Sequence, residues 1–203
     1  MGREIMKTRD KISAAALELF NAEGVGGQSA LDIASAMGIS AGHLYYHFKG
    51  KPEILAGLMA RHREEIDLVA AALRDAAHAD DLSLETLWTH VHILVEETWD
   101  ARFFWREPAL AANQPEVGEQ ARHILKTIRS AVRETLEALE DRGALSASPE
   151  VLDGFADQIT TGVAFQTCIL TLEATPAAPR EVIARAAAQI MLPAAGLAQP
   201  PAG

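Results

Sequence analysis

The stretch GISAGHLYYHFKGK, residues 38–51, places two histidines, two tyrosines and two lysines within nine positions. Their hydroxyl, imidazole and ammonium groups donate hydrogen bonds, and the rings add flat apolar surface. Side chains of this kind are too polar for a core and too aromatic for an ordinary solvated helix face. We expect them to contact a surface that combines phosphates with base edges, which is a DNA backbone and groove.

The sequence around this stretch predicts two short helices joined by a turn. Ser29 and Ser40 suit the N-caps of these helices, because a serine hydroxyl accepts a hydrogen bond from the first free N–H groups. Gly38 ends the first of the two helices. This outline is a helix-turn-helix, in which the second helix enters the major groove of DNA with its N-terminal residues nearest the base edges.

One face of the pair is expected to pack on a preceding helix at about residues 8–23. The side chains expected to pack there are Ile33, Ala34, Met37, Ile39, Leu44 and Phe48. The last two stand four positions apart and therefore share one face of the second helix. The opposite face then presents Gly42, His43 and Tyr46 to the groove.

The rest of the chain shows no alternating β pattern and reads as helices. They are expected at about residues 51–77, 82–100, 116–142, 149–173 and 180–191, with a kinked or short piece before Pro115. We therefore predict an all-α fold. Residues 1–50 form an N-terminal three-helix domain, which the helix of about 51–77 joins to a larger helical domain, residues 51–203.

Charge and composition narrow the class of protein. The net charge of −10 lies beyond residue 60, because residues 1–60 hold six of the 18 basic and six of the 28 acidic groups. A neutral region with basic groups at both ends can still meet phosphate. The single cysteine, Cys168, excludes an internal disulfide framework. The sequence shows no signal peptide and no run of ~18 apolar residues, so we expect a cytoplasmic protein with no membrane partner. We expect no metal or cofactor, because no metal-ligand run or Gly-rich phosphate loop appears.

Three segments carry a family resemblance: TRDKISAAALELFNAEG, SALDIASAMGIS and LYYHFKGKPEIL. They closely resemble the N-terminal domain of tetracycline-repressor-type (TetR family) regulators over about residues 8–60. The DNA-binding residues expected from the motif and this resemblance are Ser29, Ser40, Gly42, His43, Tyr45, Tyr46, His47 and Lys51.

The resemblance also implies a role for most of these positions. His43 matches the variable residue that faces bases, and Tyr46 matches an aromatic that touches sugar–phosphate or a thymine methyl group. The positions that match phosphate contacts are Ser29, Tyr45, His47 and Lys51. One departure is Leu31, on the first of the two short helices, where many members carry arginine or a similar polar group. Base contacts would therefore depend mainly on the second of these short helices and on DNA shape.

For the larger domain, the resemblance implies dimerisation and binding of a small effector. The helices of about 149–173 and 180–191 are apolar on more than one side, so they could form half of an intersubunit bundle or be buried within the monomer. All three tryptophans fall within residues 88–105, where they could wall a pocket or simply fill a core. The pocket candidates are Trp88, His92, Trp99, Phe103, Trp105, Arg106, Phe165 and Cys168.

The function implied is that of a ligand-responsive repressor, released from a pseudo-palindromic operator by a small, largely apolar effector. The alternative is a helical ligand-sequestering or interaction protein with weak or lost DNA binding, which Leu31 and the net charge favour. Catalysis is not expected, because Cys168 lies mid-helix among FQTCILTL and no phosphate loop or nucleophile elbow appears. We therefore expect no catalytic or metal-binding residues.

Overall fold

The computed structural model describes residues 7–170, 172 and 178–198. The chain divides into two compact units. Unit 1 comprises Met1–His62 and Ala101–Ala121, and unit 2 comprises Arg63–Asp100 and Arg122–Gly203. The long helices α4 (Lys51–Ala77) and α8 (Pro115–Asp141) contribute residues to both units.

Unit 1 is built around α1 (Thr8–Glu23), whose apolar stripe is buried at Ile12, Ala16 and Phe20. Its other complete helices are α2 (Ala30–Ala36), α3 (Ala41–His47), α6 (Arg102–Arg106) and α7 (Leu110–Asn113). The helices α2 and α3 contact each other and α1, and α6 also packs on α1. This mutual packing fixes the helix-turn-helix, because helices of seven residues are unstable alone.

The predicted inner face of the helix-turn-helix is confirmed. Ile33, Ala34, Leu44 and Phe48 are buried, and Met37 and Ile39 are half-buried. Gly38 adopts a φ of +65° at the end of α2, a left-handed conformation that favours glycine. The side chains opposite this face are therefore directed away from α1.

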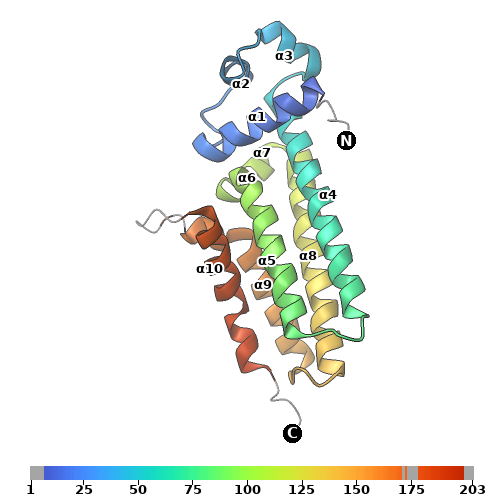
Figure 1. Ribbon diagram of the computed structural model, residues 1–203. Coiled ribbons are helices and arrows are strands. Elements are labelled where there is room, and N and C mark those ends of the chain that lie inside the picture. Colours follow the sequence, from blue (N-terminus) through green and yellow to red (C-terminus); the bar gives the residue numbers. More distant parts are fainter. Residues whose placement is uncertain (1–6, 171, 173–177, 199–203) are drawn as a thin grey trace, which may run out of the picture. The chain divides into compact units, whose positions relative to one another are not determined.

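Unit 2 contains α5 (Leu84–Asp100), α9 (Pro149–Leu170), α10 (Pro179–Met191) and the 3₁₀ helix η1 (Leu192–Gly196). Figure 1 shows α10 beside α5 and α9, and these three helices pack on one another. Gly162 permits one close approach, because a Cβ at that position would lie 2.6 Å from Ile190 Cγ1. The Thr98 hydroxyl donates a buried hydrogen bond of 2.9 Å from α5 to the Val163 carbonyl of α9.

The all-α prediction is confirmed, and helix bounds differ only at some ends. In α5 the Ser83 hydroxyl accepts a hydrogen bond from the Thr86 N–H at 3.2 Å, so the helix begins at residue 84 rather than 82. The expected end of α9 at residue 173 lies outside the described residues. Within the described ranges there is no strand, only an isolated bridge between Leu145 and Ala198. None of the described helices is both long and apolar enough to cross a membrane.

Candidate nucleic-acid interface

The helix α3 has two chemically opposite faces. Leu44 is fully buried, whereas the neighbouring Tyr45 is 49% exposed and Tyr46 is 84% exposed. Gly42 and His43 are also exposed, and a Cβ at Gly42 would lie at an ordinary contact distance of 4.0 Å from Ser40 Oγ. An aromatic side chain as exposed as Tyr46 keeps its hydroxyl and its ring available to a partner. The exposed face therefore offers hydrogen-bond donors and flat apolar surface together.

Three rings form a row along this face. The ring centroids of His43 and His47 are 5.4 Å apart, one helical turn from each other. The Tyr46 ring meets the His47 ring edge-on, with centroids 5.0 Å apart. Two imidazoles in this position can offer hydrogen-bonding ring nitrogens to any anion that contacts α3.

Ser29 and Ser40 both act as N-caps, as predicted. The Ser29 hydroxyl accepts from the Asp32 N–H at 3.3 Å, and the Asp32 carboxylate accepts from the Ser29 N–H at 2.7 Å, forming a capping box. The Ser29 hydroxyl also donates to this carboxylate at 2.6 Å and lowers the pKa of Asp32. Ser40 Oγ accepts from the His43 N–H at 3.1 Å. Each cap orients the first turn of a helix that is expected to meet DNA.

Two basic side chains hold this region together. Arg9 of α1 donates to the His47 carbonyl and to Glu53 Oε1 at 2.8 Å, and its guanidinium lies 4.0 Å from the Phe48 ring centroid. The Arg9 hydrogen bond also lowers the pKa of the Glu53 carboxyl. Lys51 Nζ donates to two carbonyl oxygens of the loop before α2. In this structure the Lys51 ammonium is thus engaged within the protein, and its contact with phosphate stays a prediction.

Sequence reasoning missed a set of contacts that ties α6 to α1. The Asn21 side chain accepts from the Phe103 N–H at 2.9 Å, and Arg106 donates to the Asn21 carbonyl at 3.2 Å. Phe103 also packs against Phe20, with ring centroids 6.0 Å apart. These residues are about 80 positions apart in sequence, and no local pattern connects them.

The buried His62 was also missed. Its Nε2 accepts from the Trp105 indole N–H at 3.2 Å, and burial lowers the His62 pKa to about 4. Nδ1, which bears the proton of the neutral ring, has no hydrogen-bond partner among the described residues. One signal was available in the sequence, because His62 lies four residues after Leu58 and four before Ile66, on the apolar stripe of α4.

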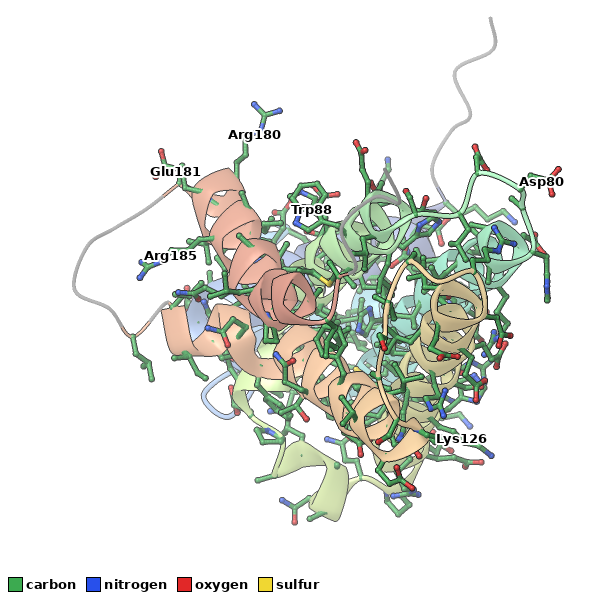
Figure 2. All side chains as sticks on the ribbon, turned by 90° about the horizontal axis from the view of Figure 1, so that it is seen from below. Asp80, Trp88, Lys126, Arg180, Glu181 and Arg185 are labelled. Atoms are coloured by element: carbon green, nitrogen blue, oxygen red, sulfur yellow. The ribbon has the colours of Figure 1, made fainter. Side chains whose placement is uncertain are left out.

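The predicted effector residues are distributed over both units. Phe103 and Trp105 are buried in unit 1, and Arg106 is exposed there. In unit 2, Trp88 is 40% exposed on α5 (Figure 2), and its ring centroid lies 5.4 Å from that of His92. The remaining candidates, Trp99, Phe165 and Cys168, are half-buried residues of unit 2.

Among the hollows formed by the described residues, one in unit 1 and one in unit 2 bear on these predictions. In unit 1, an open groove of about 670 Å³ lies at the start of α4 and around the α7–α8 junction, and none of the predicted effector residues lines it. In unit 2, a hollow of about 390 Å³ lies along α9 and α10, and Phe165 is among its lining residues.

Comparison with known proteins agrees with this geometry. A family model described as "Bacterial regulatory proteins, tetR family" matches residues 12–58, and one described as "Bacterial transcriptional repressor" matches residues 68–202. The HTH-type transcriptional regulator SrpR of Pseudomonas putida is 34% identical over 88 residues, 43% of this chain and 38% of that protein. The HTH-type transcriptional regulator TtgW, also of Pseudomonas putida and itself uncharacterized, is 34% identical over 88 residues, 43% of this chain and 60% of that protein. The matches thus span less than two thirds of either relative.

The fold is shared with solved structures. The crystal structure of a TetR-family transcriptional regulator from Marinobacter aquaeolei VT8 superposes with a TM-score of 0.84 at 23% identity, covering 96% of this chain and 93% of that chain. The curated relatives are named as transcriptional regulators, which agrees with the expectation that the chain is not an enzyme. Since one family model alone covers residues 68–202 of 203, the chain belongs to the TetR family of DNA-binding transcriptional regulators.

Proposed function

We propose that this regulator is a ligand-responsive repressor that binds a pseudo-palindromic operator as a homodimer and is released by a small, largely apolar effector. In this proposal, residues 1–50 read DNA, and residues 51–203 bind the effector and dimerise. The observation that carries the DNA-reading half is the two-faced α3 helix, with Leu44 fully buried and Tyr46 84% exposed. A repressing mode is supported by the family model described as a bacterial transcriptional repressor.

The DNA contacts proposed follow the exposed face of α3. His43 reads base edges at the centre of the face, while Tyr45, Tyr46 and His47 contact the sugar–phosphate backbone. Ser40 and the small Gly42 let the start of the helix approach the groove closely. Ser29 contacts phosphate from the start of α2 by exchanging the hydrogen bond that its hydroxyl donates to Asp32 in this structure.

Dimerisation is proposed through α9 and α10. Val151 and Ile169 on α9 are 46% and 54% exposed, although both are large and apolar. The nearby hollow of about 390 Å³ offers a surface into which a second copy could pack. A two-fold dimer presents two recognition helices about one DNA turn apart, which is the reason to expect a pseudo-palindromic operator.

An effector site is proposed at the aromatic residues of α5 in unit 2. Trp88, His92 and Trp99 supply aromatic surface with few polar groups, which suits a bulky apolar ligand. Release of DNA requires that the effector bind better to a conformation with the wrong spacing between the two recognition helices. The α4 helix, which contributes residues to both units, is the proposed lever.

The first test is selection of bound duplexes from a random pool, followed by affinity titration against salt. We expect a pseudo-palindrome to be enriched, with log affinity falling steeply against log salt. Tyr45→Phe, which removes only the hydroxyl, should weaken binding about as much as Tyr45→Ala if the contact is a hydrogen bond to phosphate. Leu68→Ala, a 72% exposed position of α4 in unit 2, serves as the matched surface control.

A rival function is sequestration of a ligand without operator binding. Leu31 supports this rival, because it is 55% exposed on α2 and presents no polar group to a base. If the pool yields no enriched sequence and the Tyr45 variants bind DNA like the wild type, the rival is favoured.

Substitution gives an independent test of the histidines. If His43 or His47 contacts the operator, the double variant His43→Gln, His47→Gln should bind it more weakly than the wild type at fixed salt. Equal affinities of the two proteins would remove both histidines from the DNA contacts.

A further inference from the structure

The loop that leads into the helix-turn-helix is unusually free of side-chain constraints. It runs from Gly24 to Gln28 and contains three glycines, two of them exposed. Glycine-rich backbone loses much conformational entropy on ordering, so such a loop needs specific contacts to hold one shape. Its shape matters because Ser29, the N-cap of α2, follows directly.

The structure supplies these contacts from two distant parts of unit 1. Glu107, just after α6, accepts the Val25 N–H at 2.7 Å. Lys51, at the start of α4, donates from Nζ to the Val25 carbonyl at 2.9 Å and to the Gln28 carbonyl at 2.6 Å. The two backbone groups of Val25 are therefore held by opposite charges, and the Val25 side chain is only 1% exposed. We call Lys51 and Glu107 the loop clamp.

The Glu107 carboxylate lies so close to the loop that position 24 requires glycine. Gly24 has a φ of +81°, and a Cβ at that position would lie 2.7 Å from Glu107 Oε1. Glu107 is itself fixed, because its N–H closes the last turn of α6 on the Phe104 carbonyl at 2.9 Å. The Asn21 contacts described above hold α6 against α1 on the adjacent turn. The carboxylate thus reaches the loop from a rigid support.

We infer that Glu107 is a positioning residue for DNA binding, which acts by clamping the Gly24–Gln28 loop and so fixing the start of α2. The inference rests on the proposed DNA interface of α2 and α3, and Glu107 itself touches no DNA in it. Hydrogen bonds to charged groups are among the stronger contacts in proteins, so loss of the carboxylate lets the loop sample conformations that misplace α2. The same reasoning gives Lys51 a positioning role that is separate from any contact with phosphate.

The test compares two variants of Glu107 with a control variant at another carboxylate. Glu107→Ala should weaken binding to the duplex enriched by the wild type roughly tenfold. Glu107→Gln should restore most of the affinity, because the amide oxygen can still accept the Val25 N–H. Glu119→Ala, which removes an exposed carboxylate of α8 in the same unit, should bind like the wild type. Circular dichroism and thermal unfolding establish that each variant is folded.

Two further readouts separate positioning from direct contact and from general loss of structure. The slope of log affinity against log salt should be unchanged in Glu107→Ala, whereas removal of a phosphate contact lowers it by about one. Amide hydrogen exchange without DNA should be faster at Val25 in Glu107→Ala and normal in Glu107→Gln. Gly24→Ala, whose methyl group displaces the carboxylate, should reproduce the Glu107→Ala effect.

The outcomes are distinguishable. Wild-type affinity in a folded Glu107→Ala variant, or a Glu107→Gln variant as weak as Glu107→Ala, would overturn the inference. Amide hydrogen exchange at Val25 that is unchanged in Glu107→Ala would overturn the inference as well. If the wild type enriches no duplex, the proposed operator reading fails, while faster exchange at Val25 in Glu107→Ala still supports the clamp.

Discussion

The contacts that stabilise unit 1 internally differ in kind from those that stabilise unit 2. In unit 1, buried or half-buried polar contacts join distant segments, as in the Trp105–His62 and Glu107–Val25 hydrogen bonds. In unit 2, close apolar packing of helices contributes most, beside the buried Thr98–Val163 hydrogen bond, and charged contacts such as Arg129 with Asp153 lie near the surface. Buried hydrogen bonds depend on geometry and protonation, whereas apolar packing depends on volume. The units should therefore respond differently to pH and to changes in side-chain size.

The comparison also extends to titratable groups. Burial lowers the pKa of His62 in unit 1 to about 4. In unit 2, burial and the neighbouring Glu65, Asp100 and Glu96 raise the pKa of Glu97 to about 6. As the pH falls, the lowered pKa of His62 decreases the stability of unit 1, whereas the raised pKa of Glu97 increases the stability of unit 2.

The largest expected effect tests whether the buried apolar side chains of the helix-turn-helix contribute more to its stability than its exposed polar side chains do. Leu44→Ala should destabilise unit 1 by about 3 kcal/mol, because Leu44 is fully buried and the cavity left behind adds to the lost burial. Segment-resolved hydrogen exchange should show the loss in α1–α3. Tyr45→Ala, one residue along, should change stability by no more than about 0.5 kcal/mol. Equal effects of the two variants would contradict the two-faced description of α3.

The second prediction concerns the pH dependence of unit 1. The folded-state pKa of His62, about 4, is below its unfolded value of 6.5, so the unfolded chain takes up the proton first as the pH falls. Stability should therefore fall between about pH 6.5 and 4, by about 2 kcal/mol from pH 7.5 to 5. Urea unfolding of the wild type and of His62→Gln at both pH values measures this contribution. The glutamine can still accept the Trp105 N–H but does not titrate, so a similar pH dependence in both proteins would exclude His62 as the cause.

The third prediction tests packing volume in unit 2. Gly162→Ala should destabilise the protein by about 1–2 kcal/mol, because its Cβ would lie 2.6 Å from Ile190 Cγ1. Gly154→Ala, in the same helix with open space around its Cβ, should instead stabilise by about 0.5–1 kcal/mol. Thermal unfolding at fixed protein concentration compares the two. The same sign for both variants would show that helix propensity, and not the α9–α10 contact, decides the outcome.

The smallest effect concerns the carboxyl group of Glu97. Its folded-state pKa of about 6 lies above the ordinary 4.5, so the stability it contributes is present below pH 4.5 and is lost as the pH rises through 6. Glu97→Gln should therefore stabilise unit 2 at pH 7.5, by about 0.5 kcal/mol after allowance for solvent screening. At pH 5 the variant and the wild type should be nearly equal in urea unfolding. A stabilisation that is as large at pH 5 would point to a cause other than ionisation.

Local sequence signals predicted the helices well, because those signals act within one or two turns. Thr8–Glu23 and Lys51–Ala77 agree with the predicted spans of 8–23 and 51–77, and the serine caps of α2 and α3 form as expected. The apolar periodicity of 3.6 residues is enough to place Leu44 inside and Tyr46 outside.

The contacts within unit 1 could not be predicted in the same way. Asn21 and Glu107 meet partners 82 positions away, and neither residue belongs to a repeating pattern that would indicate a partner. The family resemblance, supported by a place at a helix start, implies that Lys51 contacts phosphate. Neither signal reveals that two loop carbonyls lie within reach of its ammonium group. Only His62, on an apolar stripe, carried a local sign of burial.

The discontinuity of unit 1 has a consequence for how the protein is made. Met1–His62 leaves the ribosome well before Ala101–Ala121, yet the second segment supplies Phe103 against Phe20 and the carboxylate of Glu107. Contacts between segments so far apart in sequence close late in folding, after the chain between them has been synthesised. Until α5 has been synthesised and α6 can pack on α1, the nascent N-terminal segment therefore leaves the apolar surface at Phe20 without its Phe103 contact. A regulator built this way completes its proposed DNA-binding unit only after the start of its larger domain has been synthesised.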